Sequence, residues 1–543
     1  MDSGSLHTPA VSDDAVPGKV GAADAPRSLL GGYVGWRFVD RNRRKLLLML
    51  AAFCVVYGFF IAIFMGAVMA VVVLPLVVLA GLVIWLLPDG ATAPTVTMYR
   101  LLMAYMVAYL VWPDYVALSL PGLPWISAIR LIGFPLVAMF LISLSTSSQY
   151  RRELSDVLAG APWLARMVLI FMGFSVFSLI VSTSFANSMN KLVVAMIYLF
   201  AMFFISAHTF RKPGRATLFI YLMWGIMVFN CFIGLWEARL QQLPWAGHIP
   251  QFLQIQDPTV LKMFKFRARA ASGAYRVQGK FTTPLGLAEF IVLVMPLVIH
   301  IALSTRKVLV RLAAIATLPM AFMTLLATDS RLGLSGFMMA CLLYLFAWGL
   351  LQWRNHKDSI FGPAVLIGYP FMFIGFLAAT FFVGKLKLMV WGGGAQQFSS
   401  NSRALQWAMG IPKIFARPFG YGIGQSAVTL QFYNGDDLSV DSYFLTALLE
   451  YGILGFASFI GVLVSAMGYG AAGVFYAREE EDRLLVPLSI ALINFLVIKA
   501  VFTQVENHSL VFIYLGCVCA LAGRVLTRGK AVAGDGSVAE PER

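Results

Sequence analysis

Two long polar stretches between apolar segments, residues 237–284 and 384–440, contain the side chains best suited to bind an anion. Both have more Arg and Lys than Asp and Glu. Their cations are Arg239, Lys262, Lys265, Arg267, Arg269, Arg276 and Lys280 in the first stretch, and Lys385, Lys387, Arg403, Lys413 and Arg417 in the second. A guanidinium stays protonated, and its planar fork matches phosphate oxygens. The two stretches therefore predict an anion-binding site, with anionic lipid headgroups as the alternative ligand.

The chain as a whole is strongly apolar. Of its 543 residues, 59% are hydrophobic and only 12% are charged. Apolar runs of about 18–22 residues recur, and each is long enough to cross a hydrocarbon core of about 30 Å. We predict an all-α polytopic membrane protein with about 14 transmembrane helices. The predicted spans are 46–64, 67–87, 101–118, 126–145, 163–183, 191–208, 216–236, 285–304, 312–328, 332–352, 362–383, 452–474, 484–502 and 508–525.

The short connections give the expected orientation. If the spans alternate, the basic connections fall on one side, which the positive-inside rule assigns to the cytoplasm. These connections contain Arg151–Arg152, Arg211–Lys212, Arg306–Lys307, Arg354, Arg478, Arg524 and Arg528. The two long polar stretches then face outward, against the usual charge bias. We expect them to be extracytoplasmic loops containing short helices.

The predicted organisation follows from these spans. Residues 1–40, rich in Ala, Ser, Asp, Gly and Pro, are expected to be a disordered cytoplasmic N-terminus. The remaining predicted parts are transmembrane helices in 41–236, a first long outer loop in 237–284, transmembrane helices in 285–383, a large outer catalytic loop in 384–451, transmembrane helices in 452–525 and a cytoplasmic tail in 526–543.

Three segments combine Arg, Gly and carboxylate residues at the outer ends of spans. The first is Arg276-Val-Gln-Gly-Lys-Phe-Thr-Thr-Pro284, which leads into a span, and the second is the short turn Asp329-Ser-Arg-Leu-Gly333. The third, between Asn401 and Gly455, includes Arg403, Arg417-Pro-Phe-Gly-Tyr-Gly-Ile-Gly424 and Asp441-Ser-Tyr443. Its Gly422–Gly424 pair is too short for a dinucleotide fingerprint and predicts a turn or a close backbone approach.

The order of these segments resembles the O-antigen ligase and Wzy-type polymerase superfamily of bacterial membrane glycosyltransferases, over about residues 270–460. The resemblance implies transfer of a glycan from undecaprenyl pyrophosphate to a glycan or lipid acceptor. It also implies an inner-membrane location with the active site facing the periplasm, and chain-length regulator or export proteins as further partners. It identifies Arg276, Arg331 and Arg403 as the residues expected to bind the pyrophosphate.

One position departs from the ligase pattern. Ligases of this superfamily are expected to have a His where this chain has Asp441, which favours a polymerase over a ligase. His248 and His508 are also expected near the outer face, but neither lies in the matching motif.

The chemistry of a lipid-linked pyrophosphate points to the same roles. Because pyrophosphate is a good leaving group, the enzyme needs no acid, only a base for the acceptor hydroxyl, and a single displacement inverts the anomeric carbon. Asp441 is the first candidate for the base and Glu450 the second. We expect no metal and no cofactor, and read the Asp436–Asp437 pair as a solvated turn.

Further substrate-binding candidates are Lys280, Arg417, Glu289, Glu450 and Tyr443. Glu289 lies about one turn inside a span, where a carboxylate is costly. We predict that it either contacts substrate or pairs with Arg276 or Lys280 to fix the loop.

A function of another class is a flippase for lipid-linked oligosaccharides. Transporters place polar groups near the bilayer midplane and repeat their halves. Here most spans are apolar in the middle, no half-repeat is visible, and polarity concentrates in the outer loops, which favours an enzyme. The lipid bilayer is an expected partner, whereas no basic soluble domain indicates nucleic acid.

Overall fold

The structure is a computed structural model that describes residues 79, 81–83, 92–113, 115–118, 125–255, 275–382, 384, 397–434 and 437–535. The predicted N-terminal segment 1–40, the span 46–64, most of the span 67–87 and the end of the tail lie outside the described residues. So do Lys262, Lys265, Arg267 and Arg269 of the first polar stretch, Lys385 and Lys387 of the second, and Asp436.

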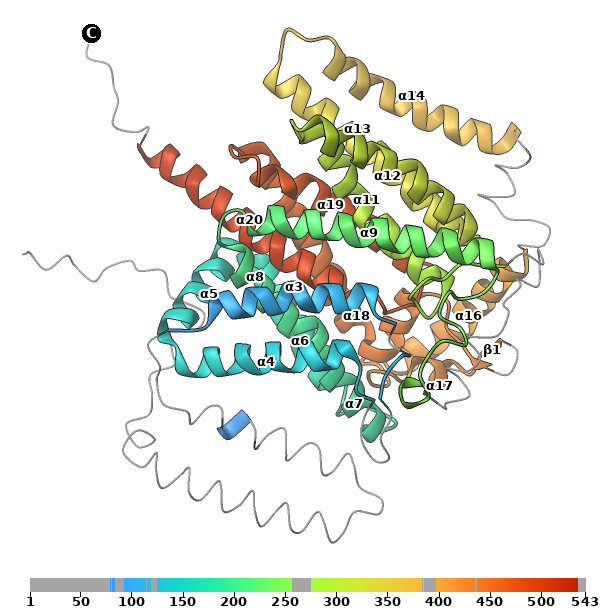
Figure 1. Cartoon of the computed structure of the whole chain (residues 1–543). Coiled ribbons are helices and arrows are strands. Elements are labelled where there is room, and N and C mark those ends of the chain that lie inside the picture. Colours follow the sequence, from blue (N-terminus) through green and yellow to red (C-terminus); the bar gives the residue numbers. More distant parts are fainter. Residues whose placement is uncertain are drawn as a thin grey trace, which may run out of the picture.

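The described chain is almost entirely helical (Figure 1). Its longer helices are α3 (Thr95–Val111), α4 (Ala128–Thr146), α5 (Ser148–Gly160), α6 (Pro162–Phe177), α7 (Phe185–Ala195), α8 (Ala201–Phe210), α9 (Arg215–Leu240), α11 (Pro284–Ser304), α12 (Val308–Ala327), α13 (Arg331–Asn355), α14 (Phe361–Phe382), α16 (Gln397–Ala416), α18 (Tyr443–Tyr476), α19 (Leu485–Lys499) and α20 (His508–Asp535). The short elements are η1 (Met196–Phe200), η2 (Gln251–Leu253), α17 (Ser426–Leu430), η5 (Asp482–Leu484) and an antiparallel ribbon of β1 (Tyr433–Asn434) and β2 (Asp437–Leu438).

Within the described ranges, nine helices are long and apolar enough to cross a membrane, or ten if the bent pair α5–α6 counts as one span. The prediction of an all-α polytopic membrane protein is thereby confirmed, while the total of about 14 spans stays a prediction. The chain bends by 108° between α5 and α6. Residues 148–160, expected to be part of a connection between two spans, therefore form a separate helix at an angle to the span.

The helices are enclosed to very different degrees. Helix α11 lies at the centre: 94% of its most apolar 18-residue stretch is buried inside the protein. The corresponding stretch of α14 is only 6% buried. Figure 1 shows α14 beside α13 at one edge of the bundle. Pro284 is at the first turn of α11, where its missing N–H costs nothing, and Thr283 caps the helix by accepting a hydrogen bond from the Gly286 N–H (3.2 Å).

One predicted span begins earlier than expected. The sequence placed the end of the large loop at residue 451, but α18 is already helical from Tyr443 and kinks at Gly452 (φ 72°, ψ −174°). The predicted boundary is therefore a break within a helix. The segment before the break belongs to the loop side of the molecule.

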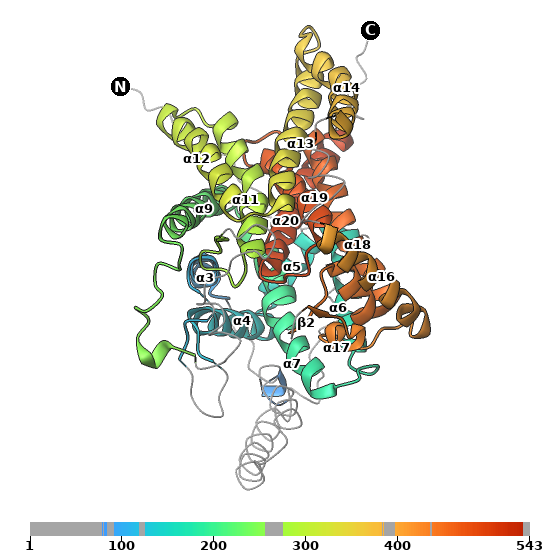
Figure 2. The same cartoon turned by 90° about the vertical axis from the view of Figure 1, so that its right-hand side faces the viewer.

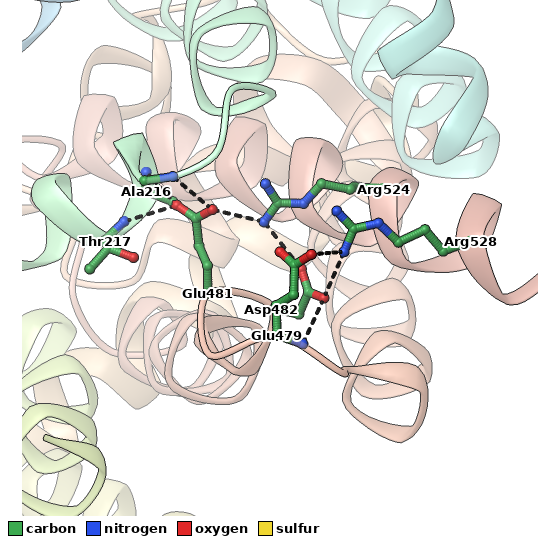
Figure 3. A network of polar contacts seen from close by, with 8 residues as sticks. Ala216, Thr217, Glu479, Glu481, Asp482, Arg524 and Arg528 are labelled. Carbon is green, nitrogen blue, oxygen red and sulfur yellow. Dashed lines mark hydrogen bonds and ion pairs between the residues drawn. The ribbon is translucent and has the colours of Figure 1, made fainter. Parts of the chain in front are cut away.

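The two ends of the bundle are built differently. At one end, which we call the network end, Glu479, Glu481, Asp482, Arg524 and Arg528 form the cluster in Figure 3. At the other, the loop end, contacts join the described residues 275–283, 328–331, 397–434, 437–442 and 500–507 to one another or to the start of α18. Figure 2 looks onto the loop end, where α16, α17 and the ribbon lie beside α18.

Candidate active site

The segments that contain Arg276 and Arg331 are adjacent. The Val277 N–H donates to the Ala327 carbonyl oxygen (3.1 Å), and Arg276 Nε donates to the Thr328 carbonyl oxygen (3.0 Å). Arg331 is the first residue of α13, three positions beyond Thr328. Two arginines that are distant in sequence thus belong to one small region of the loop end.

The short turn before Arg331 has a defined geometry. Ser330 caps α13 by accepting a hydrogen bond from the Gly333 N–H (3.1 Å), and Asp329 adopts the left-handed conformation (φ 48°). An ideal Cβ on Gly333 would lie 2.9 Å from Ala288 Cβ, so the start of α13 packs closely against α11. Arg331 is therefore held beside the helix that contains Glu289.

Glu237, which is not among the predicted site residues, fixes the segment around Arg276. Its fully buried carboxylate at the end of α9 accepts hydrogen bonds from the N–H groups of Gln278 (3.2 Å) and Gly279 (2.6 Å) and from Tyr275 Oη (2.7 Å). Gly279 has φ 59°, a conformation that favours glycine. A carboxylate near the end of an apolar span was the available signal.

Lys280 points into the protein. Its Nζ donates to the Tyr109 carbonyl oxygen (2.6 Å) and lies 4.4 Å from the centroid of the Phe281 ring. The side chain is buried, so a carbonyl dipole and aromatic faces replace water around the ammonium. The predicted role of Lys280 in substrate binding stays a prediction.

Glu289 forms a fully buried ion pair with Lys499. Glu289 Oε1 lies 2.7 Å from Lys499 Nζ, and both side chains have 0% exposure. Asn507 Nδ2 donates to Glu289 Oε2 (3.1 Å), and Lys499 Nζ also donates to the Gln504 carbonyl oxygen. The predicted pairing of Glu289 with Arg276 or Lys280 is wrong, because its carboxylate pairs with Lys499 at the end of α19 and accepts a hydrogen bond from Asn507, the residue before α20.

Lys499 is not among the predicted site residues, because it lies near the end of the otherwise mostly apolar predicted span 484–502. A lone Lys within a span was the signal that should have singled it out, since intramembrane charges are costly and need a partner. Its position also connects it to the start of α18: Lys499 Nζ lies 5.7 Å from the centroid of the Tyr443 ring.

The start of α18 is anchored to the α19–α20 turn. Ser442 Oγ donates to the Ala500 carbonyl oxygen (2.7 Å), and Thr446 Oγ1 shares a hydrogen bond with Thr503 Oγ1 (2.9 Å). Tyr443 is buried, with its ring edge-on to His508 at 4.6 Å between centroids. The contact between Tyr443 and His508 therefore helps to fix the start of α18, which directly follows Asp441 and Ser442.

Asp441 and Arg403 come together where α16 meets α18. The Asp441 N–H donates to Gln406 Oε1 (2.8 Å). Arg403 is half-buried; burial lowers the pKa of its guanidinium, and the negative charge of Asp441 opposes this shift. Because a guanidinium stays protonated in proteins, the region combines a cation with a carboxylate acceptor. Gln406 was not predicted from sequence.

Glu450 and the glycine-rich segment form a separate unit. Ser426 Oγ donates to Glu450 Oε1 (2.7 Å), and the Gly422 N–H donates to the Glu450 carbonyl oxygen (3.1 Å). Gly420, Gly422 and Gly424 have φ of 88°, 101° and 78°. The prediction of a turn or a close backbone approach is confirmed, since an ideal Cβ on Gly422 would lie 2.7 Å from the Ser182 Cα.

The remaining candidate, Arg417, is exposed and lies 5.0 Å from the centroid of the Tyr421 ring. Among the described residues, no group of three or more His, Cys, Asp or Glu side chains is arranged to hold a metal ion.

A series of contacts connects four of the predicted site residues, Lys280, Glu289, Tyr443 and Asp441. The contacts run through the pairs Lys280–Tyr109, Tyr109–Glu506, Asn507–Glu289, Glu289–Lys499, Lys499–Tyr443 and, through the adjacent main chain, Asp441–Gln406. The first polar stretch and the large loop thus meet around α11, α18 and the α19–α20 turn.

A family model matches the part of the chain that contributes Gln406, Asp441 and Tyr443 to this junction. Residues 315–460 match the model described as O-Antigen ligase. The predicted resemblance to the O-antigen ligase and Wzy-type superfamily is confirmed, and the match indicates a glycosyltransferase-like activity of the ligase or polymerase type. No curated protein matches the chain.

The O-antigen ligase match covers α13, α14, α16 and α17, together with parts of α12 and α18. It contains Arg331, Arg403 and Asp441, whereas Arg276 and Glu289 precede it. The hydrogen bond of Arg276 to Thr328 therefore brings a residue from outside the matched part into contact with it.

Proposed function

We propose that this protein is a membrane glycosyltransferase that polymerises repeat units of a surface polysaccharide, an exopolysaccharide or O-antigen. The donor is a glycan on undecaprenyl pyrophosphate, and the reaction takes place at the outer face of the inner membrane. The observation that carries the proposal is the presence of two pairs of site segments at the loop end of a membrane-helix bundle: Arg276 lies beside the turn before Arg331, and Arg403 lies beside Asp441. The O-antigen ligase family match supports it.

In this mechanism the arginines hold the diphosphate and stabilise the negative charge that develops as it leaves. Hydrogen bonds to charged groups contribute about 1.5–3 kcal/mol each, and more where water is excluded. Asp441 orients the acceptor hydroxyl and accepts its proton as the oxygen attacks the anomeric carbon. The Gln406 Oε1 bond to the Asp441 main chain supports this role, because it fixes the residue that must aim the carboxylate.

Transfer to a lipid A-core or another acceptor is the second candidate function. It is favoured by the description of the matching family model, which names a ligase. Asp441, in place of the His expected of ligases, favours the polymerase. Both reactions use the same donor, so they differ only in the acceptor.

A null mutant analysed on a gel of surface glycans tests the proposal. Loss of a polymerase should leave acceptors capped with a single repeat, and loss of a ligase should leave intact polymer on its lipid carrier. Accumulation of lipid-linked single repeats in the inner leaflet would instead indicate a flippase and contradict both enzyme functions.

Lys substitutions of Arg276, Arg331 and Arg403 test the role of the guanidinium groups. We expect each variant to lose about tenfold to a hundredfold in polymer formation at near-normal abundance, since Lys keeps the charge but lacks the fork. Arg311→Lys is the matched control, because Arg311 Nη2 donates to the Thr305 carbonyl oxygen (2.7 Å) away from the loop end. Full activity in all three site variants would contradict the mechanism.

A further inference from the structure

Gln406 has an amide whose orientation is determined by its one hydrogen bond. The side chain is 1% exposed, and its Oε1 accepts the Asp441 N–H at 2.8 Å. Because the main-chain N–H is a donor, the amide oxygen must face it, and the two N–H groups of Nε2 must point elsewhere.

Those N–H groups meet no acceptor. Within the described part of the chain, neither Gln406 Nε2 nor Arg403 Nε has a hydrogen-bond partner, although both atoms are buried. The two residues are three positions apart on α16 and therefore share one helix face. Buried donors are almost always satisfied, so two unmet donors on the same face beside Asp441 indicate that a ligand supplies the acceptor.

Two other residues serve as comparisons. Gln425 is similarly buried (2% exposed), but its Oε1 accepts from Thr183 Oγ1 (3.3 Å) and its Nε2 donates to Ser188 Oγ (3.4 Å). Arg524 also has unmet N–H groups, yet its guanidinium already pairs with Glu481 and Asp482. Gln406, by contrast, has no hydrogen-bond partner for Nε2 among the described residues.

We propose that Gln406 is a further substrate-binding residue, whose Nε2 donates to a phosphate oxygen of the diphosphate that Arg403 holds. This inference rests on the proposed function, which supplies the diphosphate. The same side chain fixes the Asp441 main chain through Oε1. Gln406 therefore couples the donor site to the carboxylate that activates the acceptor, so that the leaving group and the attacking hydroxyl are placed from a single amide.

Binding of undecaprenyl pyrophosphate to the purified full-length protein in nanodiscs tests this role without any acceptor sugar. Gln406→Glu keeps an oxygen for the Asp441 N–H but replaces the donor with a carboxylate oxygen that repels phosphate. Gln406→Met removes the donor without adding charge, together with the acceptor of the Asp441 N–H, and serves as a second variant if Gln406→Glu fails to fold. Gln425→Glu is the matched control.

We expect wild type and Gln425→Glu to bind with similar affinity, and the folded Gln406 variants to bind at least about tenfold more weakly, a difference of about 1.4 kcal/mol. Binding by both Gln406 variants at the wild-type affinity would overturn the inference and leave the proposed function standing. Absence of binding by wild type would instead contradict the donor class, and with it the proposed function.

Discussion

The network end and the loop end both bury carboxylates beside cations, but they satisfy these groups differently. At the network end, Glu481 accepts hydrogen bonds from the N–H groups of Ala216 (3.1 Å) and Thr217 (3.3 Å) at the start of α9, and from Arg524 (3.0 Å). Asp482 accepts from Arg524 (3.1 Å) and Arg528 (3.5 Å), as Figure 3 shows. The carboxylates are thus saturated by the protein itself.

At the loop end, groups of the same chemical types are left available. The Asp441 main-chain N–H donates to Gln406, and the charge of Arg403 acts on Asp441 through space, while Arg403 Nε has no acceptor among the residues that the structure describes. Carboxylates whose oxygens are all bonded join helices and make the structure rigid, and this holds at the network end although Arg524 keeps N–H groups that are unmet within the described ranges. The Asp441 carboxylate beside Arg403 is instead suited to act on a ligand. The comparison therefore assigns stability to the network end and chemistry to the loop end, and substitutions matched between the two ends can test it.

The largest expected effect comes from the carboxylates. Asp441→Asn removes the proposed base and should lower the rate of glycan transfer by about 10²- to 10⁴-fold with little change in stability. Asp482→Asn should lower the melting temperature because it weakens the bonds to Arg524 and Arg528.

Rate per folded molecule, measured with purified protein and lipid-linked donor, separates the two variants. We expect the Asp482→Asn protein to be close to wild type in this measurement. A rate loss in Asp482→Asn as large as in Asp441→Asn would remove the distinction between the ends.

The second effect concerns buried cations. Lys499→Met leaves Glu289 uncompensated at 0% exposure and should cost about 3–5 kcal/mol of unfolding free energy. Arg524→Met should cost less, because Glu481 keeps its bonds to the start of α9 and Asp482 keeps Arg528.

Unfolding of both variants in mixed micelles with increasing SDS measures the difference. The double variant Glu289→Leu/Lys499→Met should recover most of the loss, since an apolar pair no longer carries an unpaired charge. Equal destabilisation by Lys499→Met and Arg524→Met would show that the two cations are compensated alike.

Sequence patterns predicted the all-α membrane class, because span length and apolar composition are local properties, whereas the total of about 14 spans and the roles of Arg276 and Arg331 stay predictions. The partner of Glu289 was not predictable in this way. Lys499 is more than two hundred positions away, and only the packing of α11 against α19 brings it to the carboxylate. Gln406 gave no signal, because a neutral amide in a polar stretch is ordinary until its burial is known.

The smallest expected effect lies within α18, which extends from the loop end towards the network end. At Gly452 the backbone has φ 72°, and an ideal Cβ would lie 2.2 Å from the Pro418 carbonyl oxygen. Gly468, in the same helix, has nothing within 4 Å of such a Cβ. Gly452→Ala should therefore destabilise the protein by at least about 1–3 kcal/mol and displace the Pro418 segment. Gly468→Ala should instead stabilise it by about 0.5–1 kcal/mol, because alanine favours a regular helix. Melting temperatures of the two purified variants check both signs. A stabilising Gly452→Ala would mean that the kink is not required and that α18 can straighten, which would release the glycine-rich segment from its place beside Glu450.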